Sequence, residues 1–285
     1  MPYLTLISAS DLAVLVQSAA PAVVLDCSSD LSDARAGLRQ YEAGHIPGAH
    51  HVTLQQSLSG TPTGSNGRNP LPDPVVFSNA MATLSIGDDT QVVAYDNSGG
   101  LYAARLWWLL RWIGHEAVAV LNGGMPAWRA AGHPVAQEVP PPLGAASLRL
   151  RASLARSVSY EEVRANVAEA RWLVLDARTA DRFRGENETL EPRAGHIPGA
   201  RNRPFRDNLD ADGRFKTAAQ LRQEFDAATG GRQGHSIVHQ CGSGVSACHN
   251  VLAMEVAGLN GAALYPGSWS EWSTRADALI ATGDA

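Results

Sequence analysis

Short apolar runs alternate with helical patterns along the 285-residue chain. In the second half, Ser159 is placed to cap a helix that continues to about Ala170, and residues 246–256 have the pattern of a helix that Gly258 ends. The second half has predicted strands at 173–175, 236–239 and 262–264, and further predicted helices at 218–225 and at a short stretch that carries Trp269 and Trp272. The first half repeats this arrangement, with a helix over 101–113 and a strand over 117–121. Such alternation predicts an α/β fold, a mostly parallel sheet with helices on both faces.

Landmark sequences of the first half return in the second half in the same order. The seven residues 43–49 (AGHIPGA) recur unchanged at 194–200, and residues 24–26 (VLD) recur at 174–176. Residues 92–96 correspond to 237–241, and 123–128 (GGMPAW) to 267–272 (GSWSEW). Their spacing drifts slowly, which indicates two copies of one fold with loops of unequal length. We therefore predict domains at 1–139 and 158–285, joined by a semi-rigid, proline-rich linker at 140–157.

Composition narrows the class of protein. The formal net charge of −5 gives no general support for binding nucleic acid or an anionic membrane. The longest apolar stretch, 101–113, is interrupted by Arg105 and Arg111 and is shorter than the roughly 20 residues of a membrane span. Three cysteines are too few for a disulfide framework, and the early residues do not have the pattern of a signal peptide. We therefore expect a cytoplasmic protein.

The candidate chemistry follows the predicted strand that ends at His239. The next residues are Gln240-Cys241-Gly242-Ser243-Gly244-Val245, and they lead into a helix. In parallel sheets, ligands bind beyond the carboxyl ends of the strands. The glycines let successive amides turn toward the sulfur, and the helix N-terminus adds a positive dipole end, so both favour a thiolate. Cys241 is therefore a predicted nucleophile, with a small buried packing residue as the alternative.

The repeated Gly-His-Ile-Pro-Gly-Ala, the loop that begins at Cys241 and the endings at Trp128 and Trp272 resemble the tandem-domain, rhodanese-type sulfurtransferases. The resemblance covers nearly the whole chain outside the linker. It implies two rhodanese-like domains, of which only the second is catalytic through a persulfide on its loop cysteine. In the first copy Asp96 occupies the position of Cys241 and cannot carry sulfur, so this copy is expected to be inert.

The loop also bears on the sulfur donor. Family members that favour thiosulfate tend to carry cations after the cysteine, whereas Gly242 and Ser243 are neutral and resemble the loop of the 3-mercaptopyruvate sulfurtransferases. That resemblance implies that Arg182 and Arg193 hold the donor's carboxylate and ketone, a task suited to forked guanidinium groups. It also implies catalytic roles for Cys241 and Ser243, and a persulfide cradle made of the following loop residues: Gly242, Gly244, Val245 and Ser246. The expected acceptors are a thiol, a thioredoxin-like protein or cyanide, and no cofactor is expected.

The chain departs from that family at one point. In the mercaptopyruvate enzymes an Asp and a His of the N-terminal domain support the loop serine, but the corresponding stretch here has Gln55 and Asn69, with His50 and His51 out of register. Two alternatives therefore stay open. One is a thiosulfate-preferring rhodanese, and the other is a non-catalytic persulfide carrier or interaction module.

Other candidate residues have simpler interpretations. His45 and His196 lie in the same repeated motif, so a turn-stabilising hydrogen bond explains both. Cys27 and Cys248 are expected to be packing residues. We expect a solvated surface to hold Arg184, Arg201, Arg203 and Arg206 with Glu186, Glu188, Glu191 and Asp207. No metal-binding motif is present, and a cysteine phosphatase is disfavoured because its Cys-x5-Arg motif would need arginine at Ala247.

Overall fold

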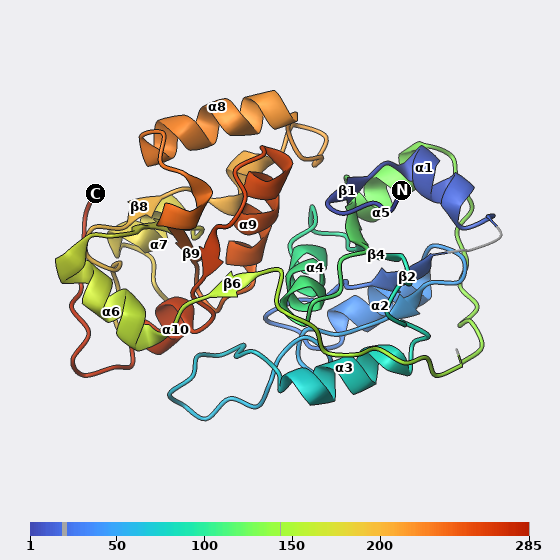
Figure 1. The fold of residues 1–285 in the computed structure, drawn as a ribbon, viewed down its shortest axis with the longest axis horizontal. Helices are drawn as coiled ribbons and strands as arrows, with labels where there is room; N and C mark the ends of the chain where they lie inside the picture. Colours follow the sequence, from blue (N-terminus) through green and yellow to red (C-terminus); the bar gives the residue numbers. More distant parts are fainter. Residues whose placement is uncertain (19–21, 143, 285) are drawn as a thin grey trace. The chain divides into compact units, whose positions relative to one another are not determined.

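The computed structural model describes residues 1–18, 22–142 and 144–284. The chain forms two compact units, drawn in Figure 1. The first unit contains Met1–Gly60, Pro72–Leu154 and Ala211–Phe215, and the second contains Thr61–Leu71, Ala155–Asp210 and Lys216–Ala285. Each unit therefore includes a short segment from the other half of the chain. Of the predicted linker and second domain, residues 143 and 285 lie outside the described part of the chain.

The first unit is built on a five-stranded parallel sheet with the order β1-β5-β4-β2-β3. Its strands are β1 (Leu6–Ile7), β2 (Val23–Asp26), β3 (His50–His51), β4 (Val92–Tyr95) and β5 (Val118–Leu121). Its helices are α1 (Ala9–Leu15), α2 (Ala36–Ala43), α3 (Pro74–Ala82), α4 (Ala103–Trp112) and α5 (Gly124–Ala130).

The second unit repeats this sheet with the order β6-β10-β9-β7-β8, again all parallel. Its strands are β6 (Arg156–Ser157), β7 (Leu173–Asp176), β8 (Arg201–Asn202), β9 (Ile237–Gln240) and β10 (Ala263–Leu264). Its helices are α6 (Tyr160–Glu169), α7 (Ala180–Arg184), η1 (Phe205–Asn208), α8 (Ala218–Thr229), η2 (Gly234–Ser236), α9 (Ser246–Val256) and α10 (Ser268–Trp272). The matching strand orders confirm the predicted duplication and the predicted α/β fold class.

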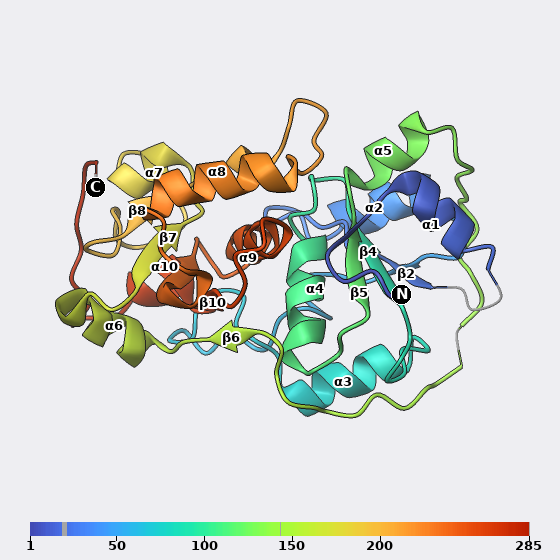
Figure 2. The same cartoon turned by 45° about the horizontal axis from the view of Figure 1, so that its top comes forward.

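Helices cover both faces of the second sheet (Figure 2). Successive side chains of a strand point to opposite faces, so each strand contributes residues to the packing on both sides. Val174 and Val238 point to one face and join a core cluster with Phe183 of α7 and Trp272 of α10. The other face packs against α9, which contacts β9 and β10, and α8 lies against α9. The strand residues are buried on both faces, as a parallel sheet requires.

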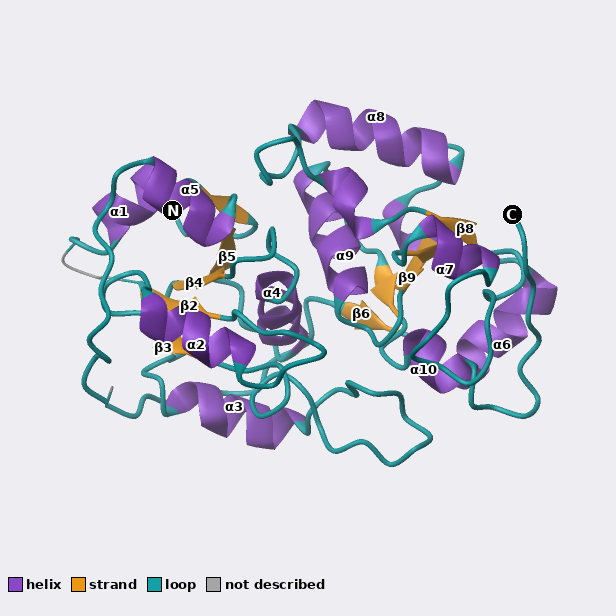
Figure 3. Ribbon diagram, turned by 180° about the vertical axis from the view of Figure 1, so that it is seen from behind, coloured by secondary structure: helices purple, strands orange, loops and turns teal. Residues whose placement is uncertain are grey.

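Local signals fix the helix ends where the sequence predicts them (Figure 3). Ser159 accepts a hydrogen bond from the Glu162 amide while the Glu162 side chain accepts one from the Ser159 amide, which is a complete capping box. Helix α9 begins at Ser246, directly after the cysteine loop. The predicted strands and helices of both halves are thus confirmed, with bounds that differ by a few residues.

The proline-rich stretch before the second unit lies against the first unit. The Ala146 amide donates to the Ala82 carbonyl at the end of α3 (2.9 Å), and the Ser78 hydroxyl donates to the Leu148 carbonyl (2.7 Å). Arg149 pairs with Asp88 at 2.6 Å. The first two contacts are with α3 and the third is with the loop after it, so this part of the stretch is attached to the first unit.

Candidate active site

Cys241 is the first residue after β9, at the carboxyl end of the second sheet. The loop that it opens is tied to the first turn of α10. The Cys241 carbonyl accepts from the Trp269 amide (2.9 Å), the Gly242 carbonyl accepts from the Ser270 amide (2.8 Å), and the Cys241 amide donates to the Ser268 hydroxyl (3.1 Å). Three bonds to a neighbouring turn fix the backbone on which the sulfur is carried.

The sulfur lies inside this loop. Cys241 is 2% exposed, and the Gly244 amide donates to its Sγ at 3.1 Å. Gly244 has φ +77°, and a Cβ at this position would lie 2.3 Å from the Pro266 carbonyl oxygen, so only glycine fits. Ser243 and Val245 are buried in the same turn, and α9 begins at Ser246. An amide that donates to Sγ has the polarity to stabilise a thiolate or a persulfide anion.

Two guanidinium groups lie beside the next residue of the loop. A Cβ on Gly242 would be 3.5 Å from Nη1 of Arg182, which the sequence predicts as a site residue. The same point would be 3.4 Å from Nη2 of Arg68, which the sequence does not predict as a site residue. Arg68 belongs to the segment Thr61–Leu71, which is part of the second unit although it comes from the first half of the chain. The glycine-rich, turn-like sequence around it carries no signal for a site.

Buried carboxylates hold both arginines. Nη2 of Arg182 donates to Glu188 at 2.8 Å, and Nε of Arg68 donates to Glu191 at 2.6 Å. The Glu188 and Glu191 side chains are only 1% and 4% exposed. Burial raises the pKa of Glu191, and the Arg68 charge opposes that rise. The expectation that both glutamates lie on a solvated surface is therefore wrong, because each is folded inward onto an arginine.

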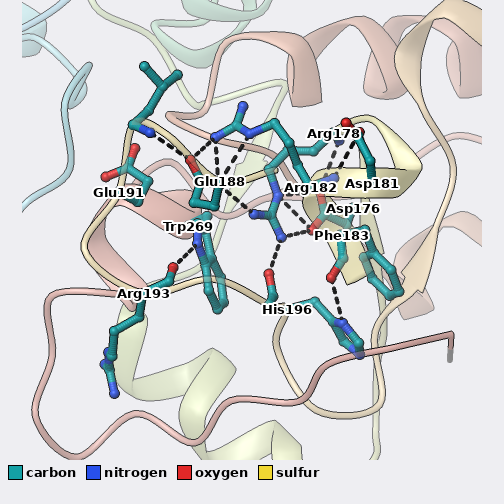
Figure 4. A network of polar contacts seen from close by, with 12 residues as sticks. Asp176, Arg178, Asp181, Arg182, Phe183, Glu188, Glu191, Arg193, His196 and Trp269 are labelled. Carbon is teal, nitrogen blue, oxygen red and sulfur yellow. Dashed lines mark hydrogen bonds and ion pairs between the residues drawn. The ribbon is translucent and has the colours of Figure 1, made fainter. Parts of the chain in front are cut away.

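A third arginine, Arg178, was not predicted and contacts the same Glu188 carboxylate as Arg182 (Figure 4). Its side chain is 1% exposed and donates to Asp176 at 2.7 Å and to the Gly195 carbonyl at 2.7 Å. It also contacts Glu188 at 3.3 Å and lies over the Trp269 ring, 4.7 Å from its centroid. The signal that could have identified Arg178 is its place just beyond the carboxyl end of β7, because ligands bind at this edge of a parallel sheet.

Arg193 is used differently from the predicted substrate-binding role. Its Nε donates to the Ser273 carbonyl at 2.7 Å, and its Nη atoms donate to carbonyls of Trp272, Arg275 and Ala278. In Figure 4 its side chain points away from Arg182 and Glu188. The last carbonyls of a helix lack hydrogen-bond partners within the helix. Arg193 donates hydrogen bonds to the carbonyls at the end of α10 and just after it. The structure therefore does not bring Arg193 to the cysteine loop.

One of the four other arginines expected at the surface is also buried. Arg203 is 5% exposed, pairs with Glu224 at 3.0 Å and lies 4.3 Å from the centroid of Phe225. That expectation is wrong for Arg203, because its guanidinium packs flat on an aromatic ring. The side chain of Arg184 is 32% exposed and paired with Glu186, while Arg201 and Arg206 are exposed as expected.

The repeated histidines have the predicted structural role in both units. Nδ1 of His196 is 2.9 Å from the Phe183 carbonyl, and its ring stacks on Phe183 with centroids 3.8 Å apart. His45 does the same with Tyr41, at 2.9 Å and 3.9 Å. The interpretation of both as turn-stabilising residues is confirmed. Cys27 and Cys248 are completely buried packing residues, as predicted.

In the first unit, an aspartate occupies the position that Cys241 has in the second unit. Asp96 follows β4 as Cys241 follows β9, and it is completely buried. Its carboxylate accepts four backbone amides of the following loop at 2.7–2.9 Å, from Ser98, Gly100, Tyr102 and Ala103. Burial raises the pKa of Asp96, and these four donors oppose the rise. The loop of the first copy is thus a cradle for an anion that the chain itself supplies.

The residues at the positions of the family's serine-supporting pair lie in different units. Gln55 is exposed in the first unit, and Asn69 is buried in the second. His51 contacts the Ser28 carbonyl through Nε2 at 2.9 Å. Over the described ranges, no helix is long and apolar enough to cross a membrane. The same residues contain no group of three or more His, Cys, Asp or Glu side chains placed to hold a metal ion.

Known proteins are similar to this chain in sequence and fold over most of their length. A Pseudomonas aeruginosa protein named as a probable 3-mercaptopyruvate sulfurtransferase is 43% identical over 269 residues, covering 92% of this chain and 93% of the relative. Thiosulfate sulfurtransferase of Cricetulus griseus is 37% identical, covering 87% and 84%. The crystal structure of SseA from Escherichia coli, titled as a 3-mercaptopyruvate sulfotransferase with the rhodanese fold, is 30% identical with a TM-score of 0.79, covering 93% and 99%.

The family assignment rests on both halves of the chain. The rhodanese-like domain matches residues 8–131 and again 159–275, one match in each half. The two matched regions contain the two parallel sheets with the same strand order. The chain therefore belongs to the rhodanese-like family, with two copies of the domain in tandem.

Proposed function

We propose that the protein is a sulfurtransferase in which Cys241 takes a sulfur atom from 3-mercaptopyruvate and passes it to a thiol, a thioredoxin-like protein or cyanide. The observation that carries the proposal is the Sγ of Cys241, enclosed at the end of β9 with the Gly244 amide 3.1 Å away. The Arg182 guanidinium beside Gly242 is suited to the donor's carboxylate and ketone. The names of the relatives support the same class of reaction.

The reaction divides into two displacements. The Cys241 thiolate attacks the donor sulfur, the bond between that sulfur and carbon 3 breaks, and its electron pair forms the enolate of pyruvate, which takes up a proton. Cys241 then carries a persulfide, whose negative charge faces the Gly244 amide. An acceptor thiolate or cyanide attacks the outer sulfur and releases Cys241 as a thiolate. Two separate half-reactions predict ping-pong kinetics.

The chain's own residues divide the work between the units. Cys241 is the nucleophile, Gly242 to Ser246 form the cradle, and buried Ser243 lies within it. The first unit has a carboxylate at the cysteine position, so we propose that it is catalytically inert. We also propose a cytoplasmic location, where reducing conditions keep a catalytic thiol free.

Thiosulfate is the second candidate donor, and the thiosulfate sulfurtransferases among the relatives favour it. With this donor the sulfur–sulfur bond breaks and sulfite leaves. The deciding measurement is kcat/KM for 3-mercaptopyruvate against thiosulfate with the same acceptor. A ratio of ten or more in favour of mercaptopyruvate supports our assignment, and the reverse ratio overturns the donor while leaving the sulfurtransferase class intact.

The nucleophile is tested by mass spectrometry after exposure to donor alone. Wild-type protein is expected to gain about 32 Da, one sulfur atom, on the peptide that contains Cys241. Cys241→Ser is expected to show neither the gain nor turnover. The matched control is Cys27→Ala, which removes a buried cysteine of the first unit and should keep both. Turnover in Cys241→Ser would remove the proposed nucleophile. Sulfur uptake without steady-state turnover would instead indicate a persulfide carrier.

A further inference from the structure

A groove with a volume of about 510 Å³ lies at the carboxyl ends of β6 and β10, where α6 and α10 begin (Figure 2). In the second sheet β10 lies beside β9, the strand that ends just before Cys241. The groove is therefore on the edge of the sheet at which ligands of parallel sheets bind. All of its lining belongs to the second unit: residues 157–162, 265–267 and 271, and residues 66, 70 and 71.

The groove shares a wall with the cysteine loop. Pro266 and Gly267 line the groove, and a Cβ on Gly244 would lie 2.3 Å from the Pro266 carbonyl oxygen, so the two backbones are in contact. The next residue, Ser268, accepts a hydrogen bond from the Cys241 amide at 3.1 Å. One turn of backbone thus separates the groove from the residue that carries the sulfur.

The charge of the groove is negative. Its lining includes Glu161, Glu162 and Glu271, and the described residues that line it include no lysine, arginine or histidine. Hydrogen bonds from its own amide and from the Ser159 hydroxyl lower the pKa of Glu161, so this exposed side chain is ionised. Arg275 neutralises only Glu271, with which it pairs at 2.8 Å.

The walls between these carboxylates are apolar. Pro70 and Val158 are buried, and Leu71 is half-buried. Tyr160 and Tyr265 are 5% and 0% exposed. Lysine and arginine bury their methylene stems on apolar surface and keep their charged heads at polar groups. An apolar floor with ionised carboxylates at its rim is therefore complementary to a short segment of chain with basic side chains.

We propose that this groove is the docking site of a protein sulfur acceptor, and that it binds a basic segment close to the acceptor's thiol. The inference rests on the proposed function, because it names the class of acceptor that meets the Cys241 persulfide. The acceptor thiolate attacks the outer sulfur, the bond between the two sulfurs breaks, and Cys241 leaves as a thiolate. The groove supplies binding, and its charge selects a cationic occupant.

The test uses three peptides of equal length, each with a single cysteine. A few residues from the cysteine, one peptide has two lysines, one has two glutamates and one has two glutamines. Cys241 is first loaded with sulfur and the excess donor is removed. The rate of transfer to each peptide is then divided by the rate of transfer to cyanide, which has no group for the groove to hold.

Wild-type protein is expected to transfer sulfur to the lysine peptide about tenfold faster than to the glutamate peptide, with the glutamine peptide between them. The difference should shrink as ionic strength rises, because salt screens charges at an open surface. Glu161→Lys reverses one charge of the groove and should lower the ratio of lysine to glutamate peptide about tenfold. Since the same peptides serve both proteins, the effect of their charges on their own thiols cancels.

The matched control is Glu169→Lys, which makes the same charge change at the other end of α6, where Glu169 pairs with Arg171 outside the groove. It should keep the wild-type ratio. Equal rates for the lysine and glutamate peptides in wild type, or an unchanged ratio in Glu161→Lys, overturn the docking site and leave Cys241 as the nucleophile. Wild-type protein that takes up no sulfur overturns the proposed function, and this inference with it.

Discussion

At the scale of single residues, burial of the Glu191 carboxyl group opposes its ionisation. Burial raises its pKa above the ordinary carboxyl value of 4.5 even though Arg68 lies 2.6 Å away. A carboxylate whose pKa is raised on folding binds its proton more tightly in the folded state. Its ionised form therefore costs free energy of folding at pH values above the raised pKa, and that cost disappears as the pH falls through it.

Glu191→Gln should consequently separate stability from activity. We expect its melting temperature at pH 7.5 to equal or exceed that of wild type, and the difference to shrink as the pH falls toward the ordinary carboxyl range. Its kcat/KM for an anionic donor should fall about tenfold, because Arg68 loses the charge that fixes it. Thermal unfolding across pH, together with steady-state kinetics, measures both effects. A melting temperature well below wild type at pH 7.5 would contradict the expectation that the ionised Glu191 carboxylate lowers the stability of the folded protein.

At the scale of elements, the loop between β9 and α9 places two glycines under different constraints. Gly244 has φ +77° and would bring a Cβ within 2.3 Å of the Pro266 carbonyl oxygen, so alanine there must displace the backbone. Gly242 lacks such a φ value, and the atoms nearest to a Cβ there would be side-chain nitrogens of Arg68 and Arg182, at 3.4 Å or more. The fold of the loop thus requires glycine at residue 244, whereas at residue 242 a methyl group would fit at ordinary contact distances beside the two arginines.

Alanine at each position tests this difference. Gly244→Ala should lower the free energy of unfolding by about 1–3 kcal/mol, the cost of a non-glycine residue in the left-handed region, and should also abolish persulfide formation. Gly242→Ala should unfold at the wild-type temperature and lose about tenfold in kcat/KM, because its methyl group occupies the donor's space. Equal losses of stability in both variants would show that the fold of the loop requires glycine at residue 242 as well as at residue 244.

At the scale of the whole molecule, the loop after the middle strand of each sheet surrounds a side chain that accepts hydrogen bonds from backbone amides. In the second unit the Gly244 amide faces a sulfur, and in the first unit four amides face the Asp96 carboxylate. The loop at the end of the middle strand thus surrounds a thiol in one unit and a carboxylate in the other, and we propose that the unit with the thiol is the catalytic one.

Asp96→Asn should affect stability without affecting catalysis. An asparagine presents an N–H group where the carboxylate accepts from Tyr102 and Ala103, so two buried amides lose their acceptor. We expect a loss of about 1–3 kcal/mol in the free energy of unfolding, with kcat/KM per folded molecule as in wild type. Cys241→Ser is the opposite case, with activity lost and stability kept. A Cys241 persulfide that no longer forms in Asp96→Asn would contradict the proposal that the first unit is inert.

Local signals in the sequence were sufficient for the fold. The repeat around His45 and His196, the alternation of apolar runs and the cap at Ser159 predict two parallel sheets with their helices, because these patterns depend on periodicity and on neighbours in the chain. The position of Cys241 after a buried strand predicted a candidate nucleophile for the same reason. The sequence also shows that arginines and glutamates lie close together over residues 182–193, but it does not show which groups form ion pairs.

What determines those partners is the packing of distant segments. Arg68 lies 174 positions before Gly242 in the sequence, and Arg193 has the right chemistry at a plausible spacing, yet the fold brings the first arginine to the cysteine loop and uses the second at the end of α10. A buried carboxylate needs a cation as its ion-pair partner, and the last carbonyls of a helix need hydrogen-bond donors. The sequence alone determined which groups need partners, and only the tertiary structure decided which partner each one obtained, because that choice depends on distances that no local pattern encodes.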